Sequence, residues 1–252
     1  MRVAMKISYH GGYFVGFQEQ PEGGSVTDAL MRAVKTLGID QKPLGAGRTD
    51  RGVHATGQMI ALNLPPFWHG REVEFVQRLN RQIAPWIRIH ALWQASDDFH
   101  PRYDALHRRY RYLFSSSEPT PFLSGFVTFV DPYDAGRIAQ AVKLFIGRHN
   151  FEWFRKTNDD DDKSFVRTIY RAGLVRRHGF DMLFFEGDAF LRSQIRMMTA
   201  FLIAIGQGRV SEEALIRQLE KRERAMSEVA APQGLYLTGV SYPAGKLLAR
   251  IV

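Results

Sequence analysis

The chain of 252 residues contains no cysteine, which excludes disulfide scaffolds, zinc sites with thiolate ligands, iron–sulfur centres and cysteine nucleophiles. It also has no long apolar run: the stretch 200–205 is far shorter than the about 20 residues that a bilayer span needs. The first residues, Met1–Lys6, lack the apolar core of a signal peptide. We therefore expect a soluble cytoplasmic protein with no membrane contact.

The chain has fewer acidic than basic residues: 26 Asp and Glu against 34 Lys and Arg, which gives a formal net charge of +8. Its 45% hydrophobic and 24% charged residues exclude a disordered chain, a collagen and a coiled coil. A basic protein of this kind favours polyanionic partners, nucleic acid above all, although a merely basic surface gives the same balance.

The hydrophobic pattern of the first half predicts a split βαβ, or ferredoxin-like, order. Residues 2–9 alternate as a half-buried strand does, and 26–37 carry a helical apolar face after a capping-box-like start at Ser25. Further strands are predicted near 58–64 and 86–93, with a helix over 73–83 between them.

The second half repeats this order, so we predict an α+β fold of two ferredoxin-like halves, residues 1–103 and 104–252. Two such mainly antiparallel sheets side by side would form a broad surface with helices behind it. The predicted elements are a strand over 108–115, a helix after Asp134, a strand pair over 166–177 and 180–187, helices over 190–206 and 211–224, and a strand over 235–242.

A glycine-rich segment, Gly45–Ala55, is the first candidate for chemistry. It places Asp50 between Arg48 and Arg51, and guanidinium groups would keep that carboxylate ionised and oriented. The segment therefore fits a carboxylate nucleophile or base. A tight turn in which Asp50 caps the backbone explains the same residues. A phosphate-binding loop is a third interpretation, but the Gly-x-x-x-x-Gly-Lys pattern is absent.

Further features of the sequence bear on function. The strand 108–112 alternates Arg and Tyr, which suits base stacking beside phosphates but also an ordinary sheet with an aromatic core face. Arg196 enters an otherwise apolar helix and needs an anion, for which Asp50 is available by type; alternatively its side chain extends to solvent. The acidic run Asp159–Asp162 suits a solvated loop better than a cation site. Neither His100 nor His107 has metal-ligand spacing, so no metal is assigned.

The full segment Gly47-Arg48-Thr49-Asp50-x-Gly52-Val53-His54-Ala55 resembles the signature of the TruA family of tRNA pseudouridine synthases. The resemblance continues in the family's order along almost the whole chain. The further matches are Tyr9-x-Gly-x-x-Phe14-x-Gly16-Phe17-Gln18, Phe99-His100-Pro101-Arg102, Arg109-Tyr110-Arg111-Tyr112, Phe190-Leu191-x-x-Gln194-Ile195-Arg196-Met197 and Ala231-Pro232-x-Gly234-Leu235-Tyr236.

The resemblance implies an isomerase that converts uridine to pseudouridine in the anticodon stem-loop of tRNA, at nucleotides 38, 39 or 40. It implies that Asp50 is the nucleophile, that Tyr110 contacts the target uracil, that Arg196 pairs with the aspartate, and that Arg48 helps to hold the flipped nucleotide. It further implies two halves joined through one extended sheet, a homodimer with tRNA bridging both subunits, and no metal or organic cofactor.

The sequence leaves the point of attack and the class of protein open. The aspartate can attack either C6 of the uracil or C1′ of the ribose, and Tyr110 is a plausible base for the C5 proton.

The sequence also leaves two other classes of protein as alternatives, a non-catalytic RNA-binding protein and a nucleotide-binding or structural ferredoxin-like protein. The intact loop around Asp50 argues against the first, and the Arg-Tyr-Arg-Tyr strand argues against the second.

Overall fold

The computed structural model describes residues 1–156, 164–177 and 179–252, which form two compact units. The first unit comprises residues 1–108 and 236–252, and the second comprises 109–235. The chain passes from one unit to the other within strand β5 (His107–Ser115) and again within β10 (Leu235–Ser241). The sequence places a single boundary after residue 103, whereas the final segment groups with the first unit.

That grouping follows from strand pairing. Tyr236 and Leu237 of β10 lie parallel to β3, in register with His54 and Ala55. Strand β11 pairs antiparallel with β4. The sheet order in the first unit is β11-β4-β1-β3-β10, with the short β2 also on β3. Its other elements are β1 (Arg2–Tyr9), η1 (Gly11–Tyr13), α1 (Val26–Thr36), β2 (Leu44–Gly45), β3 (His54–Asn63), η2 (Pro66–Trp68), α2 (Glu72–Ile83), β4 (Ile87–Ala95) and β11 (Leu247–Arg250).

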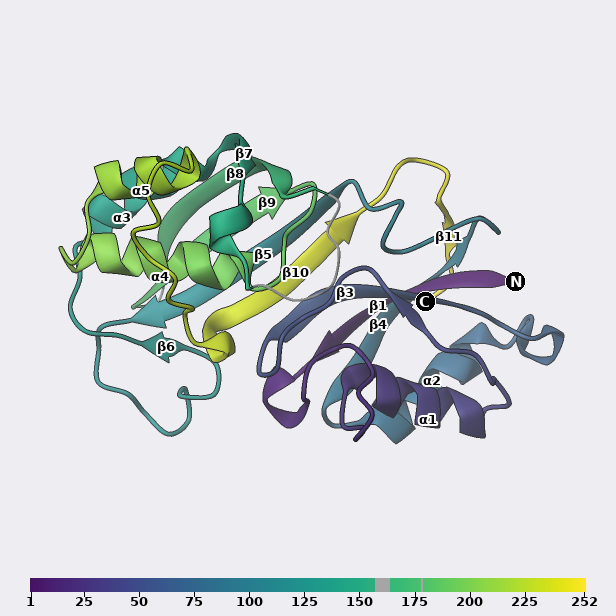
Figure 1. Ribbon diagram of the computed structural model, residues 1–252. Helices are drawn as coiled ribbons and strands as arrows, with labels where there is room; N and C mark the ends of the chain where they lie inside the picture. The colour runs from purple at the N-terminus through teal and green to yellow at the C-terminus, as the bar shows by residue number, and fades with distance from the viewer. Residues whose placement is uncertain (157–163, 178) are drawn as a thin grey trace. The chain divides into compact units, whose positions relative to one another are not determined.

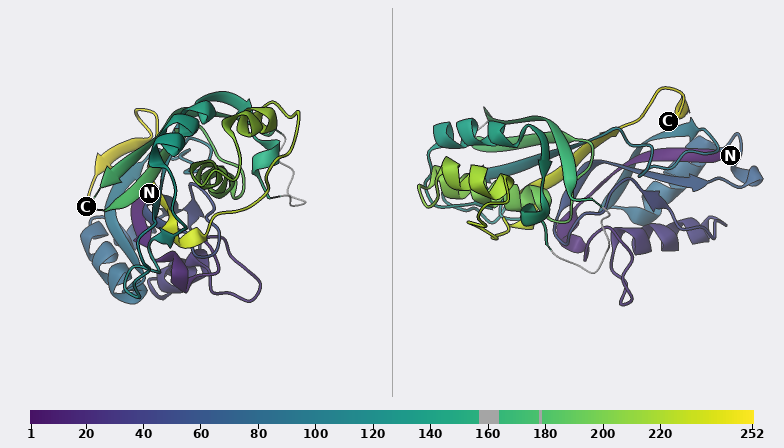
Figure 2. Two further views of the ribbon diagram at one scale, coloured as in Figure 1. Left: turned by 90° about the vertical axis from the view of Figure 1, so that its left-hand side faces the viewer. Right: turned by 45° about the horizontal axis from the view of Figure 1, so that its top comes forward.

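The helices α1 and α2 lie side by side along one face of this sheet (Figures 1 and 2). The predicted start of α1 is confirmed: the Ser25 hydroxyl accepts from the Asp28 N–H, and the Asp28 carboxylate accepts from the Ser25 N–H. Leu30, Phe75 and Leu79 of the two helices are fully buried, as are Met5 and Ile7 of β1. Burial of these side chains is the main stabilising contribution to the unit.

The second unit has the sheet order β5-β9-β8-β7, with β6 parallel to β5. Helix α3 packs against α4 and β8 (Figure 1), and Asp134 caps α3 as predicted. The elements are β6 (Thr128–Phe129), α3 (Ala135–Ala141), η3 (Val142–Phe145), β7 (Gly147–Asn150), η4 (Glu152–Phe154), β8 (Val166–Arg177), β9 (Phe180–Gly187), α4 (Gln194–Gly206), α5 (Glu212–Leu219) and η5 (Pro232–Gly234).

The predicted α+β class with mainly antiparallel strands is confirmed, and the predicted strand pair 166–177 and 180–187 has the bounds of β8 and β9. The helix predicted from residue 190 starts at Gln194, because Ser193 has a φ of 57° and stops helical continuation toward the N-terminus. The acidic run at 159–162 lies outside the described residues. None of the helices in the described ranges combines the length and apolar character that crossing a bilayer requires.

Candidate active site

The glycine-rich loop over residues 45–53 connects β2 to β3 in the first unit, and buried polar groups fix its start. The Ala46 N–H donates to the Met59 carbonyl at 2.8 Å. The side-chain amide of Gln58 donates to the Gly47 carbonyl at 2.8 Å. Gln58 is fully buried, and a buried hydrogen bond of this kind is costly to break.

Arg108 is a second anchor of the loop. The sequence leaves two interpretations of its strand open, a surface for bases and phosphates or an ordinary sheet with an aromatic core face. The side chain of Arg108 is buried, with its guanidinium donating to the Ala46 carbonyl at 3.2 Å and the Arg102 carbonyl at 2.6 Å, so this residue does not fit the first interpretation. Only Arg109 and Arg111 of this strand are exposed.

Thr49, the residue before the candidate nucleophile, is held by both its side chain and its backbone. Its hydroxyl is hydrogen-bonded to the Tyr9 hydroxyl at 2.8 Å, with both side chains buried. Its carbonyl accepts from the Phe17 N–H at 3.1 Å. The motif residues Tyr9 and Phe17 therefore act on the loop directly, a role that their separation in sequence conceals.

Asp50 begins a tight turn whose backbone is closed by a hydrogen bond from the Val53 N–H to the Asp50 carbonyl at 3.1 Å. Gly52 has a φ of 82° in this turn, a conformation that favours glycine. Asp50 is half-buried, whereas Arg48 and Arg51 are exposed. The loop therefore presents a carboxylate between two cations on a backbone that cannot shift freely.

Beyond the turn, the loop packs against η1 with no room for a side chain at Gly11. A Cβ atom there would lie 2.1 Å from the Val53 carbonyl oxygen. The Gly11 N–H donates to Nδ1 of His54 at 3.1 Å, so Nδ1 of this buried imidazole acts as an acceptor. The ring of His54 stacks on Tyr236, with centroids 4.8 Å apart. His54 and Gly11 received no role from the sequence, although both stand in the matched motifs.

In the second unit, Tyr110 is a buried residue of β5. Its ring meets Phe190 edge to face, with centroids 5.3 Å apart and planes at 78°. The aromatic face of this strand is thus packed inside the unit. This agrees with the interpretation of the strand as part of an ordinary sheet with an aromatic core face. Packing of this kind fixes the orientation of the phenol.

Arg196 is the one residue of α4 that is not buried. Its Nε donates to the Ala230 carbonyl at 2.7 Å, and its own carbonyl accepts from the Ala230 N–H at 3.1 Å. Two hydrogen bonds, one from the Arg196 side chain and one to the Arg196 backbone, therefore join this residue to Ala230. They fix the guanidinium at the edge of an otherwise apolar helix.

The segment that holds Arg196 is itself anchored by β5. The Tyr112 hydroxyl donates to the Ala231 carbonyl at 2.8 Å and is 2.7 Å from the Thr128 hydroxyl, which is therefore the donor in that second bond. Burial raises the pKa of Tyr112 from its ordinary value of 10.0 to about 12, against the opposing effects of the Thr128 hydrogen bond and the Arg196 charge. Tyr112 stays a neutral donor at physiological pH.

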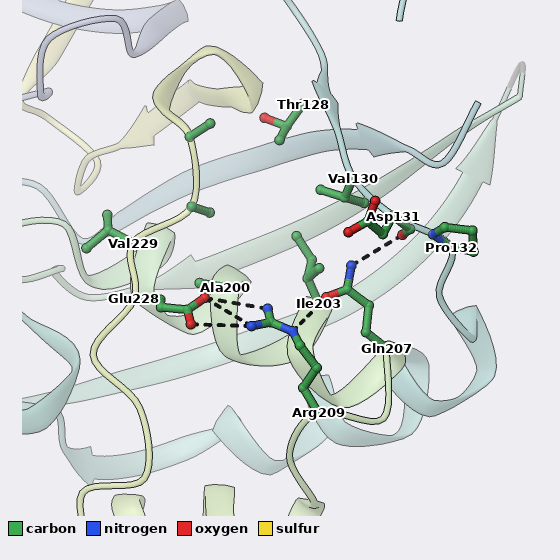
Figure 3. A pocket seen from close by; sticks show the side chains of 12 residues that line it. Thr128, Val130, Asp131, Pro132, Ala200, Ile203, Gln207, Arg209, Glu228 and Val229 are labelled. Carbon is green, nitrogen blue, oxygen red and sulfur yellow. Dashed lines mark hydrogen bonds and ion pairs between the residues drawn. The ribbon is translucent and has the colours of Figure 1, made fainter. Parts of the chain in front are cut away.

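Residues 228–231 of this segment also line a cavity of about 600 Å³ (Figure 3). Ala200 and Ile203 of α4 line it as well, and two further lining residues, Arg209 and Glu228, form an ion pair at 3.3 Å. Neither Tyr110 nor Arg196 is among its lining residues.

The structure thus places Asp50 and Arg48 on one loop of the first unit, and Tyr110 and Arg196 on β5 and α4 of the second. Within the described ranges, His, Asp and Glu side chains form no group of three suited to holding a metal ion.

Comparisons with known proteins agree with the motifs. A family model described as tRNA pseudouridine synthase matches residues 141–243. A tRNA pseudouridine synthase A from Wolinella succinogenes is 38% identical over 94% of this chain and 92% of its own length. The chain belongs to this synthase family. The enzyme of the same name from Helicobacter hepaticus is 35% identical over 94% of this chain and 97% of its own length.

Membership of this tRNA pseudouridine synthase family confirms the resemblance inferred from the sequence, and with it an isomerase. The relative from Limosilactobacillus fermentum is 35% identical over 96% of both chains. Among solved structures, a chain of a Cbf5–Nop10–Gar1 complex aligns with 80% of this chain and 45% of its own length. Its identity is 12% and its TM-score 0.38, too low to support an argument about the fold.

Substituting Gly11→Ala tests the contact between η1 and the loop. The added Cβ would meet backbone atoms of Val53, so we expect the free energy of unfolding to fall by about 1–3 kcal/mol, as for other overpacked sites. Urea unfolding measures it. Gly125→Ala is the matched control, because a Cβ there has nothing within 4 Å. Equal stability of the two variants would contradict the contact.

Substituting Tyr112→Phe removes the donor to the Ala231 carbonyl, and we expect it to cost about 1–3 kcal/mol of unfolding free energy. Because folding raises the pKa of Tyr112 to about 12, the hydroxyl stabilises the fold fully below pH 10 and loses this effect as the pH rises toward 12. The stability difference from wild type should therefore shrink over that range. Tyr103→Phe, at a residue 76% exposed, is the control. A difference that is constant with pH would refute the assignment.

Proposed function

We propose that this protein converts uridine to pseudouridine in the anticodon arm of tRNA, at position 38, 39 or 40, and that Asp50 is the nucleophile. The observation that carries the proposal is the loop around Asp50, whose neighbours on both sides are fixed by buried hydrogen bonds. A nucleophile gains most from a fixed position, because the entropy of alignment is lost before the reaction begins.

The reaction is an isomerisation, so its atoms and electrons balance within the nucleotide. The bond between N1 of uracil and C1′ of ribose breaks, the base turns, and a bond forms between C5 and C1′. The proton on C5 leaves and N1 gains one. The carboxylate of Asp50 attacks C6 or C1′ and is released at the end, so neither a metal nor an organic cofactor enters this scheme.

The remaining roles rest on the family resemblance. Arg48 holds the flipped nucleotide, Tyr110 contacts the uracil and acts as the base for the C5 proton, and Arg196 keeps the aspartate ionised. The target base must first leave its stack, which costs a few kcal/mol and is compensated by contacts to cations and aromatic rings. The packing of Tyr110 against Phe190 and the two bonds between Arg196 and Ala230 support these roles, since both side chains are held in place.

RNA binding draws on the basic character of the chain. The net charge is +8, and Arg109 and Arg111 project from β5 as exposed cations suited to phosphates. We propose that the enzyme acts in the cytoplasm as a homodimer, with one tRNA contacting both subunits.

Replacing Asp50→Asn is expected to abolish turnover while leaving tRNA binding intact, because the amide keeps the shape of the carboxylate but cannot attack carbon. Turnover is measured as tritium release from an unmodified tRNA transcript that contains 5-³H-uridine, with chelator present. Asp40→Asn, at an exposed aspartate in the same unit, makes the same change of charge and should turn over normally. Tritium release by Asp50→Asn would rule out its role as nucleophile.

Replacing Arg196→Lys keeps a positive charge but removes the guanidinium that donates to Ala230. We expect the maximum rate to fall on the order of 100-fold, because removing one preorganised donor typically costs about 10²–10³ in kcat. The exposed Arg192→Lys is the matched control. A normal rate for the Arg196 variant at saturating tRNA would show that this guanidinium has no part in the reaction.

A further inference from the structure

Two aromatic rings of the first unit stack on each other at the surface. Tyr13 of η1 and Trp86, which precedes β4, have ring centroids 3.3 Å apart and planes at 24°. Tyr13 is 54% exposed and Trp86 is 40% exposed. The two rings together form a contiguous exposed apolar patch, and such patches mark interaction sites more often than isolated exposed rings do.

This pair is connected to the loop that carries Asp50. The His10 N–H donates to the Trp86 carbonyl at 3.0 Å, and the His10 ring lies edge-on to both Tyr13 and His54, with 4.8 Å between centroids in each case. The adjoining Gly11 packs on Val53 at the end of the candidate loop. The exposed rings are therefore tied through rigid contacts to the residues that follow the proposed nucleophile.

Basic side chains lie on β4, which follows Trp86, and on the neighbouring β1. Ile87 and Ile89 of β4 are buried, whereas Arg88 and His90 are exposed on the other side of the strand. The neighbouring β1 places Lys6 opposite Ala91, next to His90. Burial lowers the pKa of His90, and so do the positive charges of Arg88 and Lys6. Exposed aromatic rings beside a positive field match the chemistry of single-stranded nucleic acid.

We propose that the Tyr13–Trp86 pair is a stacking platform for an unpaired base of the RNA substrate that flanks the target uridine, with Arg88 and Lys6 facing the adjoining phosphates. This inference rests on the proposed function for the identity of the RNA. The charge complementarity favours RNA over a second protein surface. Stacking is sequence-tolerant, since every base has a π face, so the platform would secure different anticodon loops equally well.

Binding of an unmodified anticodon stem-loop tests the platform. The RNA carries 2-aminopurine on the 5′ or the 3′ side of the target, and its fluorescence is quenched when it stacks. We expect Tyr13→Ala and Trp86→Ala each to raise the dissociation constant about 10-fold and to restore the fluorescence, because stacking on one ring is worth roughly that much. Tyr13→Phe, which keeps the ring, should bind normally.

Phe67→Ala is the matched control, because this ring is also 54% exposed but lies in η2. Unchanged affinity and fluorescence in a variant that combines Tyr13→Ala with Trp86→Ala would overturn the platform. So would a change from dimer to monomer with RNA affinity retained, since the rings would then lie between protein copies. A wild-type protein that binds RNA but releases no tritium would refute the proposed function alone, because ring-dependent binding and quenching are read without turnover.

Discussion

The immobility of one short loop is the constraint on which the rest of the first unit depends. A carboxylate on a free loop samples many positions, and ordering a residue costs about 1–2 kcal/mol in backbone entropy alone. Here that cost is met during folding. Gln58 and Arg108 hold residues 46 and 47, Tyr9 and Phe17 hold Thr49, and Gly11 closes against Val53.

A comparable arrangement exists in the second unit, where the fixed group is a cation. A guanidinium at the edge of an apolar helix is stabilised only when its donors find partners. Ala230 supplies one of these, and the neighbouring Ala231 is in turn held by Tyr112 and Thr128. In both units, groups proposed to act on RNA are therefore held by residues to which no role toward RNA is assigned, and preorganised sites are generally built in this way.

Much of the fold could be predicted from local pattern. Strand β1 has the bounds that its alternation indicates, and α1 begins at the capping box formed by Ser25 and Asp28. The very short β2 and β11 were missed, because strands of two to four residues carry no measurable period. The start of α4 was set four residues too early, since the positive φ of Ser193 is decided by its surroundings rather than its residue type.

The site could be predicted only in part, for a related reason. The chemistry of Asp50 is visible from its neighbours in sequence, and the motifs identified the family. The support of the loop is not visible, because Tyr9 and Arg108 lie far from it along the chain and act through single hydrogen bonds. Arg108 is an example: its place in an alternating basic strand left a phosphate contact and an ordinary sheet position both open, and its guanidinium donates to carbonyl groups.

The division of the chain has a consequence for biosynthesis. Strands β10 and β11, which complete the sheet of the first unit, follow the whole of the second unit in sequence. During synthesis the first unit begins to form first but is completed last. The edges of β3 and β4 that pair with β10 and β11 therefore stay unpaired while residues 109–235 are made. Such edges invite unwanted pairing with other chains. Rapid folding of the intervening unit would limit the period for which the nascent protein is exposed to aggregation.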